Sequence, residues 1–143
     1  MATLTASNSV ITLGVFGIFS TAQILQGFDV DDMFSSEAIT SAETRMGVDA
    51  RLSAGWVPTE KKTTFTLQAD SISNDVFDVW HMTQEAAQEL SVAFGVVILP
   101  AISKKFVLGR GFLTSYMPIT DAKKLLQPRK YVVTWESILS APF

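Results

Sequence analysis

The sequence predicts a mainly β fold: an antiparallel β-sandwich or barrel with one flanking α-helix, in a single domain over residues 10–143. Two observations carry this prediction. Short runs in which apolar and polar residues alternate recur along the chain, and residues two apart on a strand share a face. A helical spacing of four replaces this alternation convincingly only at about residues 73–84. Strands on both sides of one helix favour an antiparallel sheet that packs against it.

The N-terminal part begins with small polar residues at positions 1–9, which we interpret as a flexible arm. Val10–Phe19 is apolar and alternates poorly, so it is either an edge strand or an extended segment that docks on a neighbouring molecule. Gln23–Phe28 is predicted to form a short strand that ends at Gly27. An acidic turn follows at residues 29–32.

A long hairpin is predicted over Glu37–Trp56, with its turn at Met46–Asp49. Its odd-numbered face carries the charged residues Glu37, Glu43, Arg45, Asp49 and Arg51. Its even-numbered face carries mostly small and apolar residues, among them Ala42, Met46, Val48, Ala50, Leu52, Ala54 and Trp56. A hairpin is marginal by itself in water, so we expect its apolar face to pack under the helix or against a neighbouring subunit.

The remaining elements follow from the same two patterns. A turn is expected at Val57–Lys62 and a strand at Thr63–Ala69. The helix has Ser73 as a suitable N-cap and Asp75 in its first turn, where the helix dipole favours an acid. Later strands are predicted at Glu89–Leu99, Lys105–Tyr116 and Arg129–Leu139, and a loop at Met117–Pro128, with one helical turn at Asp121–Leu126. The expected core between sheet and helix comprises Phe65, Leu67, Val76, Phe77, Trp80, Val133 and Trp135.

Composition favours self-association. Apolar residues make up 48% of the 143 residues and charged residues only 17%, which is few for the surface of a soluble monomer. Residues 1–60 hold seven acids and two bases, and residues 61–143 hold seven acids and nine bases, a bias that suits head-to-tail contacts. Four basic pairs near predicted turns favour an acidic partner surface over nucleic acid: Lys61-Lys62, Lys104-Lys105, Lys123-Lys124 and Arg129-Lys130.

No catalytic, metal or cofactor site is predicted. The chain has no cysteine and one histidine, His81, whose nearest acidic neighbour on the helix is Asp78; that pair is more often a surface contact than a catalytic one. The acidic residues at 29–32 lack the spacing of a calcium loop. The apolar run Val10–Phe19 is shorter than the ~20 residues that a membrane-spanning helix needs. We therefore expect a protein that is not an enzyme and does not insert in a membrane.

Several segments resemble the inner tail tube protein of contractile-tailed bacteriophages. Gly27-Phe28 ends a short strand and is followed by Asp31-Asp32 and Met33. The hairpin tip reads Gly47-Val48-Asp49, where the family often has Gly-x-Asp-Gly, but Ala50 replaces the last glycine. The strand at residues 64–71 leads into Ser73-Asn74, where the family begins its helix, and the chain closes with a strand at residues 131–135. The resemblance extends over most of the chain from about Gln23.

The resemblance implies a subunit that forms hexameric rings, stacked into a hollow tube inside a contractile sheath and serving as the conduit for genome ejection. Implied partners are further copies of the chain, the tail sheath, baseplate and tail-terminator proteins, and DNA that passes without specific binding. Implied localisation is the virion tail, assembled in the host cytoplasm. In this setting Glu37, Glu43, Arg45, Asp49 and Arg51 are candidates for the lumen wall. Candidates for contacts between rings or subunits are Asp31, Asp32, Met46, Gly47, Val48, Lys61 and Lys62.

Alternative functions remain open at this point. Within the same fold, the chain fits a baseplate hub, a tube-initiating ring, or a tube subunit of a bacteriocin or secretion system. A more distant alternative is a ligand-binding β-barrel, with interior apolar residues around a pocket.

Overall fold

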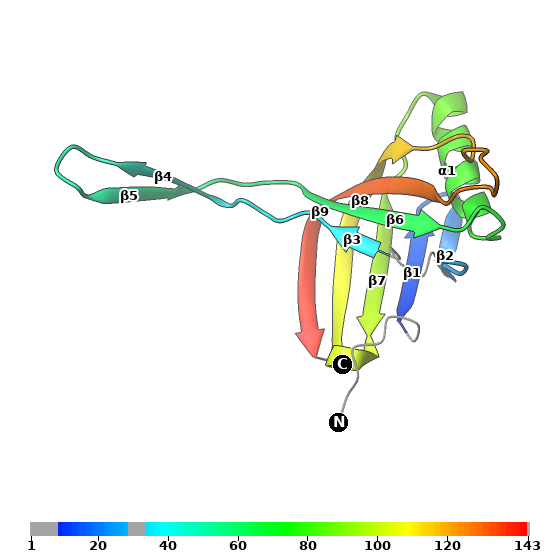
Figure 1. Cartoon of the computed structure of the whole chain (residues 1–143), viewed down its shortest axis with the longest axis horizontal. Coiled ribbons are helices and arrows are strands. Elements are labelled where there is room, and N and C mark those ends of the chain that lie inside the picture. Colours follow the sequence, from blue (N-terminus) through cyan, green and yellow to red (C-terminus); the bar gives the residue numbers. More distant parts are fainter. Residues whose placement is uncertain (1–8, 29–33, 143) are drawn as a thin grey trace.

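The structure, a computed structural model, describes residues 9–28 and 34–142 (Figure 1). Its body is one seven-stranded sheet in the order β2-β1-β7-β8-β9-β6-β3, with every neighbouring pair antiparallel. The strands of this sheet are β1 (Val10–Val15), β2 (Phe19–Ile24), β3 (Phe34–Ser36), β6 (Lys61–Leu67), β7 (Ala93–Leu99), β8 (Lys104–Tyr116) and β9 (Arg129–Pro142). A separate two-stranded sheet consists of β4 (Ala42–Met46) and β5 (Leu52–Trp56). The predicted mainly β, antiparallel class is confirmed, and the sheet is sandwich-like rather than a closed barrel. The expected flexible arm lies almost wholly outside the described residues.

The sandwich arises because β8 and β9 are long enough to take part in both layers. The first half of β8 pairs with β7 and with the end of β9, whereas the start of β9 pairs with β6. β9 crosses the top of the body and then turns down, and the path of β8 is similar (Figure 1). β8 bends at Gly109–Gly111, where Arg110 has a positive φ of 47° and the register with β7 shifts. A Cβ at Gly111 would lie 2.3 Å from the Trp135 ring, so the close approach requires glycine there.

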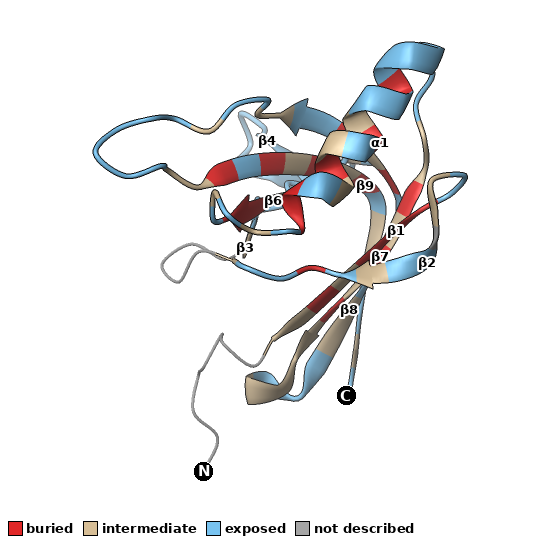
Figure 2. Cartoon of the chain, turned by 90° about the vertical axis from the view of Figure 1, so that its right-hand side faces the viewer, coloured by how far each residue is buried: buried red, intermediate tan, exposed pale blue. Residues whose placement is uncertain are grey.

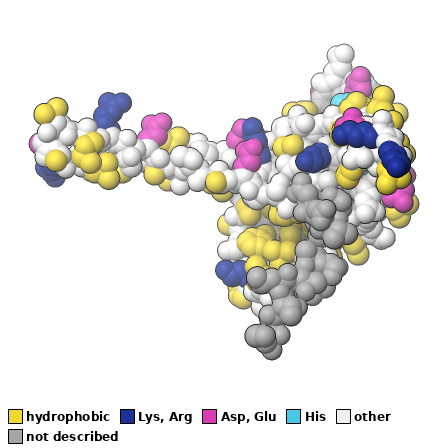
Figure 3. All heavy atoms as spheres, in the orientation of Figure 1, with side chains coloured by type: hydrophobic (Ala, Val, Ile, Leu, Met, Phe, Trp, Pro, Cys, Tyr) yellow, Lys and Arg dark blue, Asp and Glu magenta, His cyan; other side chains and the backbone are white. Residues whose placement is uncertain are grey.

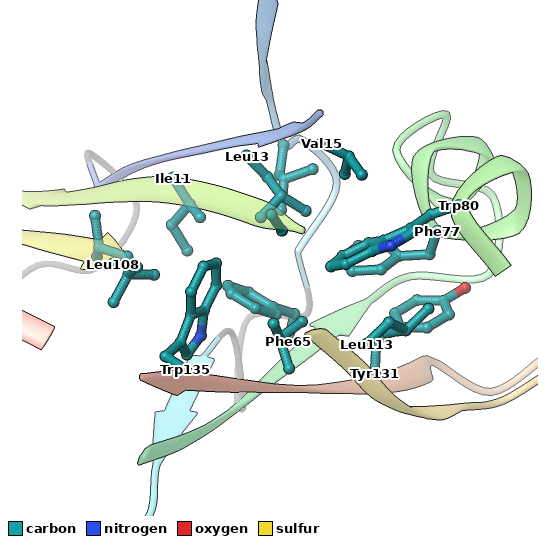
Figure 4. Close-up of a cluster of buried hydrophobic side chains, with 14 of the residues drawn as sticks. Ile11, Leu13, Val15, Phe65, Phe77, Trp80, Leu108, Leu113, Tyr131 and Trp135 are labelled. Atoms are coloured by element: carbon teal, nitrogen blue, oxygen red, sulfur yellow. The ribbon is translucent and has the colours of Figure 1, made fainter. Parts of the chain in front are cut away.

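The core lies between the two layers and the helix α1 (Asn74–Ala87) (Figure 4). Phe77 of the helix stacks on Tyr131 with ring centroids 4.2 Å apart and an interplanar angle of 3°. The buried residues of α1 face the strands, and its exposed residues face away (Figure 2). Of the expected core residues, Val76 is half-buried and the others are buried: Phe65, Leu67, Phe77, Trp80, Val133 and Trp135.

The N-terminus of α1 differs in detail from the expected cap. Ser73 holds the N-cap position but makes no side-chain capping hydrogen bond. Its hydroxyl instead accepts a hydrogen bond from the Gln26 amide at 2.7 Å, which ties the helix start to the segment after β2. The side chain of Asn74 reinforces this junction. Its Nδ2 donates to the Gln68 backbone carbonyl, and its Oδ1 accepts from the Tyr131 hydroxyl.

Several predicted elements are placed differently. The apolar run at residues 10–19 is not an edge strand: β1 lies between β2 and β7, with Ile11, Leu13 and Val15 buried. The edge strand on this side of the sheet is β2, which begins earlier than the predicted strand at 23–28 and ends at Ile24. The predicted helical turn at 121–126 is a loop with an isolated bridge between Ala122 and Leu126. Other strands agree within a few residues.

Candidate assembly site

The hairpin of β4 and β5 projects from the body as an arm (Figure 1). Every residue of both strands is exposed, including Trp56, whose exposed fraction is 77%. The expected packing of its apolar face under the helix is therefore wrong. Hydrophobic and charged side chains share the surface of the arm (Figure 3). Because an isolated two-stranded hairpin is marginally stable in water, this arm is suited to gain a partner outside its own chain.

The tip of the hairpin is a three-residue loop, residues 48–50, which Gly47 and Arg51 close. Met46 pairs with Leu52, the Gly47 amide donates to the Arg51 carbonyl at 2.9 Å, and the Ala50 amide donates to the Gly47 carbonyl at 3.0 Å. The turn thus extends beyond the predicted Met46–Asp49. Ala50 has a positive φ of 64°, the conformation that glycine adopts most easily in such loops. A glycine would be unstrained at this position, so Ala50 adds strain to a turn that nonetheless forms.

The two faces of the hairpin follow the expected alternation, because the register pairs odd with odd and even with even positions. Glu43 and Arg45 lie on one face of β4, and Asp49 and Arg51 belong to the tip. Glu37 lies outside the hairpin strands, in the connection from β3, and its amide donates to the Lys62 carbonyl. None of these five candidates for the lumen wall belongs to the seven-stranded sheet.

The candidates for contacts between subunits divide into three groups. Asp31 and Asp32 lie outside the described residues. Met46, Gly47 and Val48 are exposed at the tip. Lys61 and Lys62 were expected in a turn, but they begin β6 and pair with residues of β9. Lys61 donates to the Glu136 carbonyl at 3.1 Å, and Lys62 lies 3.4 Å from a carboxylate oxygen of Glu60.

A groove of 540 Å³ lies where the hairpin joins the body. Its apolar lining includes Trp56, Pro58 and Phe112, and its charged lining includes Glu60, Arg110 and Glu136. The Arg110 guanidinium lies 6.0 Å from the centre of the Phe112 ring, and its Nε is 3.8 Å from a Glu136 carboxylate oxygen. Sequence patterns did not indicate this groove, because its walls come from the hairpin base, β8 and β9.

Among the strands that the structure describes, the seven-stranded sheet ends in β2 on one side and in the short β3 on the other, and a further edge is open along the later part of β9. β2 is the outermost strand on one side. On the other side β6 pairs with β9 only over Arg129–Trp135, so the following part of β9 has β8 as its single described neighbour. Open edges present unpaired backbone donors and acceptors and are natural sites for adding a further strand.

A partly buried polar cluster joins α1 to the loop between β8 and β9. Arg129 Nη2 donates to the Asp78 carboxylate at 2.7 Å and to the Met117 carbonyl at 2.8 Å, and Tyr116 donates its hydroxyl to Asp78. Burial raises the pKa of Asp78, but hydrogen bonds from Arg129 and Tyr116 outweigh it, and the pKa lies below its ordinary 3.8. His81 stacks on Tyr116 at 4.2 Å. The prediction that Arg129 belongs to an exposed basic pair is therefore wrong.

The contacts of this cluster hold parts of the fold together. Arg129 is buried and attaches the loop at residues 117–128 to the helix through Asp78. Within the described residues no group of three or more histidine, aspartate or glutamate side chains is arranged to hold a metal ion. Nor does any helix in those ranges combine the length and apolar character needed to cross a membrane.

Comparisons with known proteins give a family and a shared fold. The family described as "Tail fiber protein gp32" matches residues 2–139. A search of curated protein sequences found no match. The tube-terminating cap of the anti-feeding prophage is similar in structure, with a TM-score of 0.58, 8% identity, and coverage of 100% of this chain and 93% of that chain.

Two further structures are similar. The sheath/tube terminator of an extracellular contractile injection system has a TM-score of 0.57 and 11% identity, with 99% of this chain and 98% of that chain covered. The baseplate of the anti-feeding prophage has a TM-score of 0.55 and 11% identity, again with 99% of this chain and 98% of that chain covered. At these identities the likeness shows a shared fold.

Proposed function

The chain belongs to the family described as tail fiber protein gp32, and from this membership we propose that it is a structural subunit of a contractile phage tail. In this proposal copies of the chain form rings that stack into the tail tube, inside a sheath and above a baseplate. Structures with the same fold come from the tube caps, terminators and baseplates of contractile injection systems, which supports the proposal. The observation that carries it is that β2 and the later part of β9 have open edges, on a sheet whose fold is shared with such particles.

The edges define how neighbouring copies would join. The five strands β2, β1, β7, β8 and β9 alternate in direction, so β2 and β9 run the same way. A rotation about a ring axis preserves strand direction. The edge of β9 in one copy would therefore meet β2 of the next in a parallel seam, and the contact is head-to-tail, as a closed ring requires.

The absence of cysteine from the sequence makes this seam testable by cross-linking. Ser140 lies on the open part of β9 and Thr21 on β2, and both side chains are exposed. We expect the double variant Ser140→Cys and Thr21→Cys, treated with a short bismaleimide, to give a ladder of covalent oligomers that ends at a closed ring. Each single variant should give no species beyond a dimer.

Negative-stain microscopy of the purified protein separates the tube from its alternatives. Stacked rings or tubes are the expected result. Closed single rings that never stack would favour a cap, terminator or baseplate role instead. A monomer over a wide concentration range, with no ladder in the double-cysteine variant, would contradict the proposal.

A further inference from the structure

The groove at the hairpin base contains an arginine in an unfavourable backbone conformation. Arg110 lies between Gly109 and Gly111 and has a φ of 47°. Glycine adopts such a φ without strain, whereas arginine does not. A strained residue that persists in a bulge commonly serves to aim its side chain. Here the bulge places the guanidinium over Phe112 and opposite Glu136, at the groove.

The tip of the hairpin has a surface that matches this groove in composition. Met46, Val48 and Leu52 are large apolar side chains with exposed fractions of 63%, 110% and 62%. Asp49 and Arg51 provide one acid and one base beside them. The groove likewise combines apolar side chains, Trp56 and Phe112 among them, with charges of both signs.

The tip and the groove of one copy are held apart. Trp56, the last residue of β5, lines the groove, and Leu52, the first, pairs with Met46 at the tip. Leu52 and Trp56 are four residue steps apart, which along a strand is about 13 Å, so the hairpin keeps its own tip out of its own groove. A tip can therefore enter a groove only between copies. Because tip and groove are different surfaces, such a contact repeats from copy to copy into a ring or a filament.

We propose that the groove receives the hairpin tip of a second copy of this chain. Val48 and Met46 would cover Trp56 and Phe112, and Asp49 of the tip would face Arg110 of the groove. This inference rests on the proposed self-assembly and names the surface that receives the arm. A tip in a groove buries far less than the ~1,600 Å² of a stable interface, so this contact adds to the sheet-edge seam and does not replace it.

Charge reversal tests the pairing in the full chain. We expect Asp49→Arg and Arg110→Asp each to weaken self-association by at least about tenfold in sedimentation velocity and light scattering. Aspartate tolerates a positive φ, so Arg110→Asp is compatible with the bulge. Arg110→Gly provides a second variant that keeps the backbone and removes the charge. The combination of Asp49→Arg with Arg110→Asp should restore association to within about threefold of the unmodified chain.

Controls separate this inference from the proposed function. Glu43→Arg makes the same change of charge on the hairpin shaft, away from the tip, and should leave association unchanged. In the tip and groove variants the cross-link between Ser140→Cys and Thr21→Cys should persist. If that ladder persists and neither reversal weakens association, or if the combined variant is no better than the single ones, the tip–groove contact is wrong while self-assembly stands. If the unmodified chain does not associate and the variant with Ser140→Cys and Thr21→Cys alone gives no ladder, the proposed function itself fails.

Discussion

Replacing Asp78 by asparagine tests the partly buried polar cluster that joins the helix to the loop after β8. Asparagine keeps the shape of the side chain and one acceptor oxygen. It removes the negative charge and puts an NH2 donor in place of the second carboxylate oxygen, which accepts from Arg129 Nη1 at 3.4 Å. Arg129 would then keep its bonds to the Met117 carbonyl at 3.1 and 2.8 Å but lose its charged partner at 2.7 Å. It has no route to solvent without detaching the loop, because its side chain is only 9% exposed.

The size of the effect follows from burial. Removing one partner of a buried ion pair costs about 3–5 kcal/mol, since the other charge stays desolvated. The side chain of Asp78 is 30% exposed and Arg129 retains two carbonyl contacts, so we expect the lower end, ~3 kcal/mol. For a chain of this size that loss corresponds to a fall in Tm of roughly 10 °C.

Urea and thermal unfolding followed by circular dichroism measure this loss. Glu85→Gln is the matched control: its carboxylate contacts His81 at 3.4 Å but is 75% exposed, and we expect a change within about 0.5 kcal/mol. A loss below about 1 kcal/mol in Asp78→Asn would refute the reasoning, because it would mean that water reaches the guanidinium or that the pair adds little.

The same pair sets a pH dependence. The pKa of Asp78 in the folded chain lies below its ordinary 3.8, so its contribution is fully present above that pH and is lost as the pH falls through the folded pKa. The free energy of unfolding of Asp78→Asn should therefore lie below that of the unmodified chain by a constant ~3 kcal/mol from pH 5 to 8. This difference should shrink below about pH 4. A difference that does not change in acid would contradict the assignment.

Three further substitutions probe the core, the bend and the tip. Phe77→Ala should cost about 3–5 kcal/mol in urea unfolding, because it empties a fully buried site stacked on Tyr131. Gly111→Ala should cost about 1–3 kcal/mol, since its Cβ would lie 2.3 Å from the Trp135 ring; an unchanged Tm would mean that the bend relaxes freely. Ala50→Gly should slow amide hydrogen exchange in the hairpin and leave global unfolding unchanged, because the hairpin lies outside the core; faster exchange would show that φ at Ala50 is not strained.

Much of the secondary structure could be predicted because its signals are local. Alternation at Thr63–Ala69 and the spacing of Phe77 and Trp80 report which face each element buries, and β6 and α1 lie where these patterns place them. Alternation also determined the two faces of the hairpin. Its direction away from the body could not be predicted, because an apolar stripe is the same whether its partner is the same chain or another.

The assembly site was only partly predictable. The exposed tip residues Met46 and Val48 came from the turn signal, whereas the groove depends on a bulge at Arg110 and on strands distant in sequence. Arg129 and Asp78 are 51 residues apart, and each alone has the pattern of a surface charge. Polar partners that meet only after the sheet and helix pack leave no periodic signal.

By itself the sequence determined the antiparallel β class, the position of the one long helix, the absence of cysteine chemistry and the two-faced character of residues 42–56. The tertiary structure alone decided that β1 is internal, that β9 has an open edge, and that Arg129 is buried against Asp78. The physical reason is the distance in sequence over which each kind of interaction acts. Periodicity and turn chemistry act between residues a few positions apart, whereas strand order, open edges and buried charge pairs arise from contacts between segments that meet only in the folded chain.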